Sequence, residues 1–244
     1  MHDISTALPI QRCRWHVTVD AQSMCETVAA RTLAAAAEAL RERGRFVVVL
    51  AGGNTPRGMY ETLRTAQTDW SRWHVYFGDE RCAPRGDLAR NSTMAGSSWL
   101  DHVPIPALQR HAVPAERGAV DAARLYAATV EGEGEFDLVL LGLGEDGHTA
   151  SLFPGHQLGQ GPDAPDVLAV RDAPKPPPDR VTLSAHRLSW SREVVFLVTG
   201  ESKHDVVRRW RSGQDLPARA IAPPAGVDVF VEETLVTSSL EGGR

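Results

Sequence analysis

The chain has 244 residues, of which 42% are hydrophobic and 23% charged, the balance of an ordinary water-soluble globular protein. This length fits one large domain or two small ones, and no Ser/Gly-rich linker divides it, so we expect a single domain over residues 1–244. The formal net charge of −5 argues against nucleic acid as a partner, so any bound anion must be held by a local cluster of cations.

The cysteines and the apolar segments bear on where the protein works. The three cysteines, Cys13, Cys25 and Cys82, are odd in number and have no C-x-x-C spacing, which is typical of reduced thiols in the cytosol. Arg81 could lower the pKa of the neighbouring Cys82 thiol, but a bystander thiol is the simpler interpretation. The N-terminus lacks a signal-peptide core, and no uninterrupted apolar run approaches membrane-spanning length. We therefore expect a cytoplasmic protein without a membrane partner.

Apolar strands and helical segments alternate along the chain. The segment Trp15–Asp20 alternates as a strand does, and residues 21–43, followed by Gly44 as a stop signal, indicate a helix. The continuous apolar run Phe46–Leu50 is typical of a strand that is buried on both faces. Further strands are expected at 73–77, 136–141, 181–184, 193–199 and 227–231, and further helices at about 57–66, 91–100, 119–131 and 203–210.

Residues 163–179 hold five prolines and are expected to form a surface loop. The order of the other elements predicts an α/β fold, with a single doubly wound, mostly parallel sheet and helices on both faces. Three of the apolar strands end in polar, glycine-containing turns with the sequences AGGNTP, GDER and GLGEDGH. Such turns emerge at one edge of a parallel sheet, where ligands bind in open α/β folds.

The first turn, Gly52-Gly53-Asn54-Thr55-Pro56, follows a strand and precedes a helix. The glycines allow the backbone to approach a ligand closely, Asn54 or Thr55 suits the N-cap, and Pro56 suits the first helical position. Free N–H groups at a helix N-terminus bind anions, although the same residues can also form a cap with no ligand. The turn is not a Walker A loop, because no G-K-[ST] ends it.

Three cations stand near the expected strand ends. Arg81 is suited to a phosphate or a carboxylate, although it can equally pair with Asp79 or Glu80. Lys203 begins a helix and can reach a bound phosphate or remain solvated. Arg180 enters a strand and faces either the crevice or solvent.

The third turn, residues 142–147, has the letters G-x-G-x-x-G after a strand, which would suggest a dinucleotide site. Pro154 would cut short the helix that such a turn opens, and the strand comes late in the chain. Asp146 lies two residues before His148, and an Asp–His pair raises the basicity of the imidazole as general-base catalysis requires. No G-x-S-x-G elbow or H-E-x-x-H motif is present, so we expect neither a serine hydrolase of the α/β type nor a metal or other cofactor.

Together these motifs resemble the 6-phosphogluconolactonase family, whose blocks read GGSTP, DERxVP with a later SN, GxGxDGHTASLFP, PPxxRxTL and GxxK. The corresponding blocks here are GGNTP (52–56), DERCAP (79–84) with Asn91-Ser92, GLGEDGHTASLFP (142–154), PPPDRVTL (176–183) and GESK (200–203). Asn54 replaces the usual serine of the first block. The related glucosamine-6-phosphate deaminases/isomerases have a glutamate where this chain has Phe153, and they favour a tyrosine where it has Arg81.

The resemblance implies hydrolysis of 6-phospho-D-glucono-1,5-lactone to 6-phospho-D-gluconate, in the oxidative pentose phosphate pathway. His148 would be the general base and Asp146 its support, with Asp79 as an orienting acid. The residues implied in substrate or phosphate binding are Gly53, Asn54, Thr55, Asp79, Arg81, Arg180 and Lys203. The expected partner is a small sugar phosphate, bound by a monomer or a small homo-oligomer. The alternatives are a deaminase/isomerase, a non-catalytic sugar-phosphate-binding protein and an NAD(P) oxidoreductase.

Overall fold

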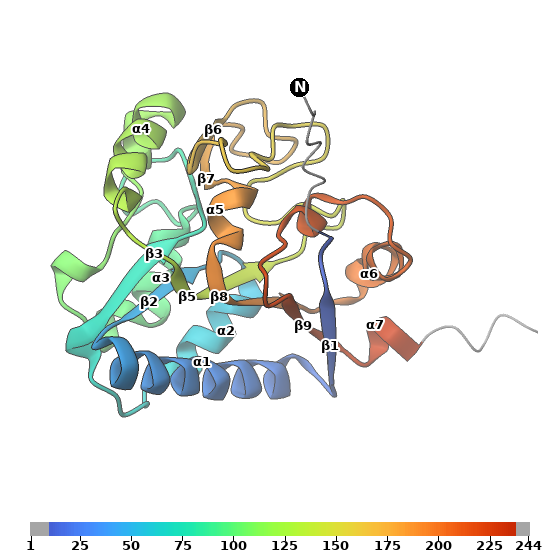
Figure 1. Cartoon of the computed structure of the whole chain (residues 1–244), viewed down its shortest axis with the longest axis horizontal. Coiled ribbons are helices and arrows are strands. Elements are labelled where there is room, and N and C mark those ends of the chain that lie inside the picture. The colour runs from blue at the N-terminus through green and yellow to red at the C-terminus, as the bar shows by residue number, and fades with distance from the viewer. Residues whose placement is uncertain (1–9, 238–244) are drawn as a thin grey trace, which may run out of the picture.

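The computed structural model describes residues 10–237, which contain two β-sheets with helices packed around them (Figure 1). The larger sheet has six strands, all parallel, in the spatial order β1-β9-β8-β5-β2-β3. Its strands are β1 (Cys13–Thr18), β2 (Phe46–Leu50), β3 (Trp73–Phe77), β5 (Phe136–Gly142), β8 (Ser191–Val198) and β9 (Val227–Glu232). The prediction of an α/β fold with a mostly parallel sheet is confirmed.

Helices cover both faces of this sheet. Those on or beside it are α1 (Ala21–Arg43), α2 (Asn54–Leu63), α3 (Asn91–Ser98), α4 (Ala119–Val130), α5 (Ala185–Ser189), α6 (His204–Arg211) and α7 (Thr234–Thr237). The long α1 packs on α2 and on four strands of the sheet, β1, β2, β5 and β9 (Figure 1). Asp20 caps its start by accepting a hydrogen bond from the Ser23 N–H at 2.7 Å, and Gly44 ends it in the left-handed region.

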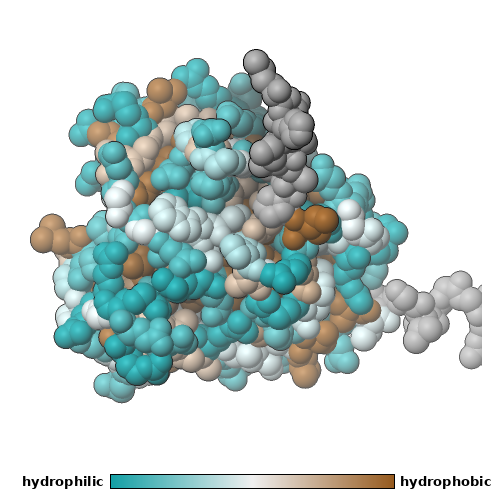
Figure 2. Space-filling model, in the orientation of Figure 1, coloured by the Kyte–Doolittle hydropathy of each residue, from teal (hydrophilic) through white to brown (hydrophobic). Residues whose placement is uncertain are grey.

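The core lies between these layers. Every side chain of β2 is buried, as are the first six of β5, so the two strands read as continuous apolar runs because helices cover both of their faces. Figure 2 shows one face of the molecule as mainly hydrophilic, with hydrophobic residues in small separate patches. Among the helices of residues 10–237, none combines the length and the apolar character that crossing a membrane requires.

The smaller sheet was not expected. Its strands are β4 (Asp79–Arg81), β7 (Arg180–Leu183) and β6 (Val167–Val170), paired antiparallel in the order β4-β7-β6. The prediction of one continuous loop over 163–179 is therefore wrong, since β6 lies inside it, between Pro165 and Pro174. The segment GDER is likewise part strand rather than a free turn. Helix α4 packs on β6 and β7.

Gly78 joins the two sheets. Its N–H donates to the Leu50 carbonyl at 2.9 Å in the larger sheet, and its carbonyl accepts from the Leu183 N–H at 2.8 Å in the smaller one. The chain therefore passes from β3 into β4 without a loop. Asp79 and Arg81 are thereby brought to the carboxyl end of the larger sheet.

Candidate active site

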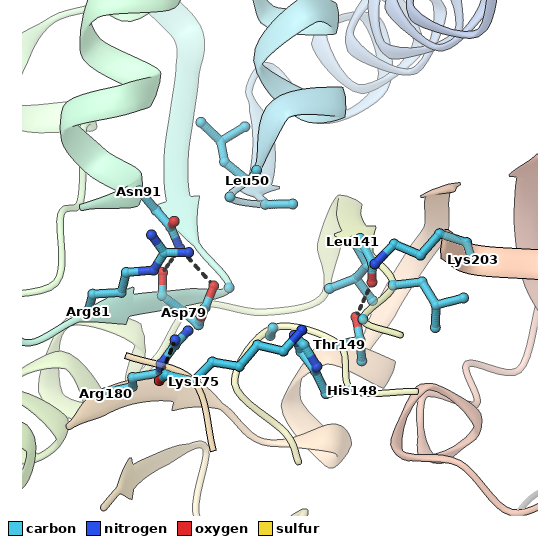
Figure 3. Close-up of a pocket in the computed structure, with 18 of the residues that line it drawn as sticks. Leu50, Asp79, Arg81, Asn91, Leu141, His148, Thr149, Lys175, Arg180 and Lys203 are labelled. Atoms are coloured by element: carbon cyan, nitrogen blue, oxygen red, sulfur yellow. Dashed lines mark hydrogen bonds between the residues drawn. The ribbon is translucent and has the colours of Figure 1, made fainter. Parts of the chain in front are cut away.

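A cavity of about 450 Å³ opens at the carboxyl end of the larger sheet (Figure 3). The three glycine-containing segments meet there, as expected from the parallel strand order, and contribute Gly52–Gly53, Gly78–Asp79 and 142–144. The charged and polar side chains that line it are Asp79, Arg81, Asn91, His148, Thr149, Lys175, Arg180 and Lys203. The cavity is thus richer in cations than in carboxylates.

His148 is seated over the turn that follows β5. Its Nδ1 lies 2.5 Å from Asp146 Oδ1, and its backbone N–H donates to the same carboxylate oxygen at 3.1 Å. The Phe153 ring packs beside the imidazole at 4.7 Å between centroids. A Cβ atom at Gly144 would lie 2.0 Å from His148 Nδ1, so the ring can occupy this place only because residue 144 has no side chain.

The electrostatics of the pair favour a neutral imidazole. Burial lowers the pKa of His148, and the positive charge of Lys175 acts in the same direction, while Asp146 opposes both. Burial acts to raise the pKa of Asp146, but hydrogen bonds from the His148 backbone and ring outweigh it, so this pKa is lowered. Because the carboxylate only accepts, it places the imidazole proton on Nδ1 and leaves Nε2 free to take a proton.

The turn that carries His148 does not open a helix. Residues 143–154 form consecutive turns, with Ala150 in the left-handed region at φ 49°. Side chains pin both sides of Ala150, because Thr149 Oγ1 donates to the Gly142 carbonyl at 2.8 Å and Ser151 Oγ to Asp79 Oδ2 at 2.5 Å. A dinucleotide turn needs a helix N-terminus for the pyrophosphate, so this geometry argues against a nicotinamide site here.

Asp79 is buried and held by two neutral donors. Asn91 Nδ2 donates to Oδ1 at 2.8 Å, and the Ser151 hydroxyl bonds to Oδ2. Burial raises the pKa of Asp79. Gly52 makes room for this arrangement, since a Cβ there would lie 2.0 Å from Asn91 Oδ1. Asn91 and Ser151 were not among the site residues expected from the sequence, although both fall within the motifs that carry the family resemblance.

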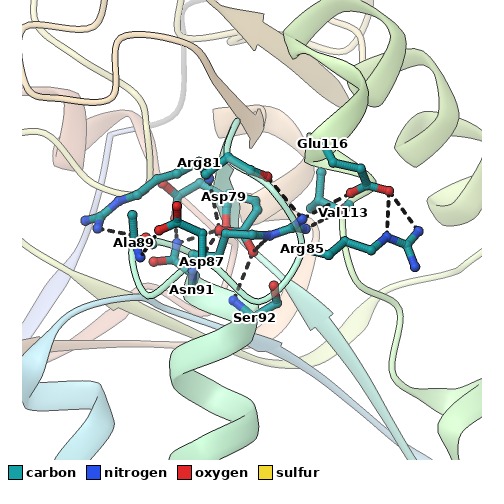
Figure 4. Close-up of polar contacts among 12 residues, drawn as sticks. Asp79, Arg81, Arg85, Asp87, Ala89, Asn91, Ser92, Val113 and Glu116 are labelled. Atoms are coloured by element: carbon teal, nitrogen blue, oxygen red, sulfur yellow. Dashed lines mark hydrogen bonds and ion pairs between the residues drawn. The ribbon is translucent and has the colours of Figure 1, made fainter.

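A buried carboxylate, that of Glu80, fixes the start of α3 at Asn91 and Ser92, and Figure 4 shows the polar contacts around these two residues. Glu80, which is fully buried, accepts the backbone N–H groups of Arg81, Asn91 and Ser92 at 2.9, 2.7 and 2.9 Å. Arg90 reaches the same carboxylate at 3.4 Å. A negative charge at a helix N-terminus satisfies free N–H groups and opposes the helix dipole. Glu80 therefore sets the backbone of two lining residues, which excludes the simple ion pair between Glu80 and Arg81.

The lining cations have few ionic partners. Arg81 Nη1 donates to the Ala89 carbonyl at 2.9 Å, and its buried Nε has no hydrogen-bond partner in the part of the chain that the structure describes. Across residues 10–237, no carboxylate lies within ion-pair distance of Lys175 or Lys203. Burial lowers the pKa of Lys203. Lys175 lies in the segment predicted to be a loop, and no motif in the sequence pointed to it.

One expectation about the first turn, the residue at its N-cap, needs correction. Helix α2 begins at Asn54, and Gly53 with φ 106° takes the N-cap place that Asn54 or Thr55 was expected to fill. The side chains of Asn54 and Thr55 border a neighbouring pocket, where Thr55 Oγ1 lies 2.5 Å from Thr199 Oγ1, and neither residue lines the cavity. Gly52 and Gly53 do line it, so the backbone of this turn is the part available to a ligand.

The Cys82 thiol and the possible metal-binding side chains complete the description of the site. Burial, with Asp179 and Glu80, raises the pKa of Cys82 to about 11, which favours the bystander interpretation over a thiol activated by Arg81. Within residues 10–237, His, Cys, Asp and Glu side chains form no group of three or more that could hold a metal ion.

Comparisons with known proteins place the chain in a family. Residues 19–230 match the family model of glucosamine-6-phosphate isomerases/6-phosphogluconolactonase. The chain is 36% identical to a 6-phosphogluconolactonase of Mycobacterium leprae over 230 residues, 88% of this chain and 91% of the relative. It is 36% identical to that of Streptomyces coelicolor over 225 residues, 85% of each.

A solved structure gives the same result. The 6-phosphogluconolactonase of Thermotoga maritima superimposes with a TM-score of 0.83 at 27% identity, covering 91% of this chain and 100% of that one. The family model, the relatives and the solved structure agree, so this chain belongs to the glucosamine-6-phosphate isomerase/6-phosphogluconolactonase family.

Proposed function

We propose that this protein hydrolyses 6-phospho-D-glucono-1,5-lactone to 6-phospho-D-gluconate, a step of the oxidative pentose phosphate pathway. The relatives that cover most of the chain carry the name of this lactone hydrolase. The observation that carries the proposal is the pair of Asp146 and His148, whose imidazole faces a cavity lined by uncompensated cations. A base beside an anion-binding surface is the equipment that hydrolysis of a phosphorylated ester needs.

A lactone is an activated ester, so water can attack it without a covalent enzyme intermediate. His148 Nε2 takes a proton from water while the water oxygen bonds to the lactone carbonyl carbon, and the carbonyl electrons move onto oxygen. When this intermediate collapses, the bond to the ring oxygen breaks and His148 returns the proton to that oxygen. Asp146 holds the ring orientation and stabilises the imidazolium that exists between the two transfers.

The phosphate binds at the other residues of the cavity in this proposal. The backbone of Gly52 and Gly53 precedes the N-terminus of α2, where N–H groups and the helix dipole favour an anion. Arg81 and Lys203 supply counter-charges without breaking an ion pair, because neither has one in residues 10–237. Each Asp79 oxygen already accepts one hydrogen bond and has a lone pair left for a sugar hydroxyl.

Phe153 favours lactone hydrolysis over the deaminase/isomerase reaction of the same family. The deaminase motif has a glutamate at this position, whereas Phe153 is fully buried and packs against His148 and the Arg180 guanidinium. No carboxylate therefore stands at this place to act on an amino sugar. A non-catalytic sugar-phosphate binder would not need the hydrogen-bonded Asp146–His148 pair.

The test compares two histidine variants. His148→Ala should lower the turnover of freshly generated lactone by about 10²–10⁴-fold, the range for removal of a general base. His156→Ala is the matched control, because His156 also packs on Phe153, at 5.9 Å, but does not line the cavity. Full activity in His148→Ala would overturn the assignment, and ammonia release from glucosamine 6-phosphate by the wild type would favour the deaminase.

A further inference from the structure

The buried guanidinium of Arg180 forms hydrogen bonds with the backbone of the protein itself. The residue is 5% exposed, and its guanidinium donates to three successive backbone carbonyls, those of Lys175 at 3.0 Å, Pro176 at 3.2 Å and Pro177 at 3.1 Å. Its Cζ also lies 5.5 Å from the centroid of the Phe153 ring. Three bonds from one planar group to three consecutive carbonyls fix a stretch of backbone far better than a single contact would.

The fixed stretch is the one that presents Lys175. Figure 3 shows the Lys175 side chain running across the cavity, with its ammonium group ending beside His148. No ion-pair or hydrogen-bond partner of this ammonium group is present among residues 10–237. Lys175 is exposed, so it can reach its place without the desolvation cost of a buried charge. An ammonium group thus stands, unpaired, next to the base.

We propose that Lys175 is a catalytic residue of this cavity that stabilises the negative charge on the lactone carbonyl oxygen, and that Arg180 is the residue that positions it. This inference rests on the proposed function. As water attacks, the carbonyl electrons move onto oxygen and the Lys175 ammonium donates a hydrogen bond to it. When the bond to the ring oxygen breaks, these electrons re-form the carbonyl double bond. Lys175 therefore neither gains nor loses a proton. Preorganised donors of this kind contribute much of the rate in ester hydrolysis.

Arg81 and Lys203 lie where they can bind the phosphate instead of the lactone carbonyl. In Figure 3, Arg81 lies on the Asn91 side of the cavity, away from His148. Lys203 lies on the side of Thr149 and the end of β5. Among the causes that shift the pKa of His148 within residues 10–237, Lys175 is the cation that stands out, and its charge lowers this pKa. The two outer cations therefore suit the phosphate, and Lys175 suits the reacting carbonyl.

The kinetic test separates the two tasks. Lys175→Met should lower kcat by about 10²-fold, the effect of removing one oxyanion donor, with little change in KM. Lys203→Met, a matched loss of one ammonium group, should mainly raise KM. Unchanged kcat in Lys175→Met would overturn the inference while leaving the lactonase proposal intact, whereas the absence of lactone hydrolysis by the wild type would remove the proposal itself.

A double-variant cycle tests the role of Arg180. Arg180→Gln should reproduce the kcat loss of Lys175→Met, and the double variant should lose little more than either one, because the two residues act as one unit. Additive losses, with a raised KM in Arg180→Gln, would mean that Arg180 contacts the substrate directly. Melting temperatures identify a folding failure, and Lys175→Met, at an exposed position, decides the catalytic claim without Arg180.

A pH titration of His148 provides a second measurement, because a purely structural role of Lys175 would leave the pKa of His148 unchanged. The charged groups that face His148 are Asp146 in its own turn, Asp79 from β4, Lys175, and Lys203 across the cavity. Lys175→Met removes the cation that lowers the pKa of His148, so the ring should titrate at higher pH in NMR spectra. An unchanged His148 titration would place the ammonium group away from the ring and overturn the inference.

Discussion

The two ends of the larger sheet differ in whether their cations have carboxylate partners. At the amino end, Asp228 on β9 is 1% exposed and is bound by Arg14 at 2.6 Å, His16 at 2.6 Å and Arg31 at 2.7 Å. At the carboxyl end, Lys175 and Lys203 have no ion-pair partner in residues 10–237. Both ends therefore gather cations, but the two lysines of the cavity lack the carboxylate partners that the cations at the amino end have.

A second carboxylate repeats the pattern at the amino end. Asp137 on β5 accepts from Arg43 Nε at 2.9 Å and from the Val47 N–H at 2.8 Å, and Arg192 lies 3.6 Å away. These contacts tie β5 to α1, β2 and β8. Compensated charges thus stabilise the fold, whereas charges left uncompensated are available to a ligand. The difference teaches that pairing, more than residue type, separates structural cations from functional ones.

The largest expected effect concerns the seat of His148. Gly144→Ala places a methyl group where the imidazole now lies, 2.0 Å from Nδ1, so the ring must move away from Asp146. We expect a loss of about 10²-fold or more in kcat, approaching that of removing the base, at an unchanged melting temperature. Gly134→Ala is the control, because a Cβ there meets no atom within 4 Å and the residue does not line the cavity. Equal activities of the two variants would break the link between this turn and catalysis.

At the amino end the loss should be in stability instead. Asp228→Asn leaves three cations without their carboxylate and should cost about 2–4 kcal/mol in the free energy of unfolding, toward the low side for buried pairs because the partners reach solvent. The pKa of Asp228 is lowered, since bonds from Arg14 and His16 outweigh burial. Its contribution is therefore present above the ordinary carboxyl pKa and is lost as pH falls through the folded value.

Denaturant titrations at neutral and acid pH would measure this, and the difference in unfolding free energy between wild type and Asp228→Asn should shrink as pH falls below the ordinary carboxyl pKa. Asp205→Asn is the matched control, since the ion pairs of Asp205 on α6 are exposed. This variant should leave the free energy of unfolding without a measurable change. A loss of lactone turnover in Asp228→Asn at full stability would show that the two ends are not independent.

A smaller effect is expected at the Asn91 side of the cavity. Gly52→Ala would place a Cβ 2.0 Å from Asn91 Oδ1, which displaces the amide that holds Asp79. We expect kcat/KM to fall about tenfold, equivalent to about 1.4 kcal/mol. Asn91→Ala should give a similar loss, and combining the two changes should add little. Additive losses would show that Gly52 contacts the substrate rather than making room for Asn91.

The smallest effect is a displaced pH dependence. The pKa of His148 is lowered by burial and by Lys175, so the neutral ring should persist below the usual histidine range. NMR titration of the free enzyme should therefore give a His148 pKa below about 6.5, and activity should fall only at lower pH. A His148 pKa above this value would mean that Asp146 outweighs burial and Lys175. The cavity would then stabilise a charged pair, as the amino end of the sheet does.

The fold was largely readable from apolar runs. Phe46–Leu50 and Trp73–Phe77 coincide with β2 and β3, because strands buried on both faces have no polar positions to blur them. Strand β6 was missed because prolines flank it and local turn signals dominate such a short segment. The antiparallel pairing of β4 with β7 joins residues about a hundred positions apart, which no local pattern reveals.

The site was readable only in part. His148 and Asp146 are two residues apart, so their contact follows from a tight turn and could be predicted. The position of Lys175 depends on bonds from Arg180 that form only when β7 pairs in the smaller sheet, so sequence pattern alone could not place it. The same bonds engage Nε and Nη2 of Arg180, a side chain that the sequence left facing either the crevice or solvent. The roles of Gly53, Asn54, Thr55 and the other expected binding residues remain predictions.

The uncompensated cations have a consequence for turnover. In the proposed reaction an uncharged ester becomes a carboxylate, so the product carries one more negative charge than the substrate. Arg81, Lys175 and Lys203 should then hold the product more tightly than the substrate, in a protein whose net charge of −5 otherwise repels anions. We therefore expect product release to limit turnover at low ionic strength. Inhibition by 6-phospho-D-gluconate should weaken as salt screens these charges, and salt-independent inhibition would contradict this expectation.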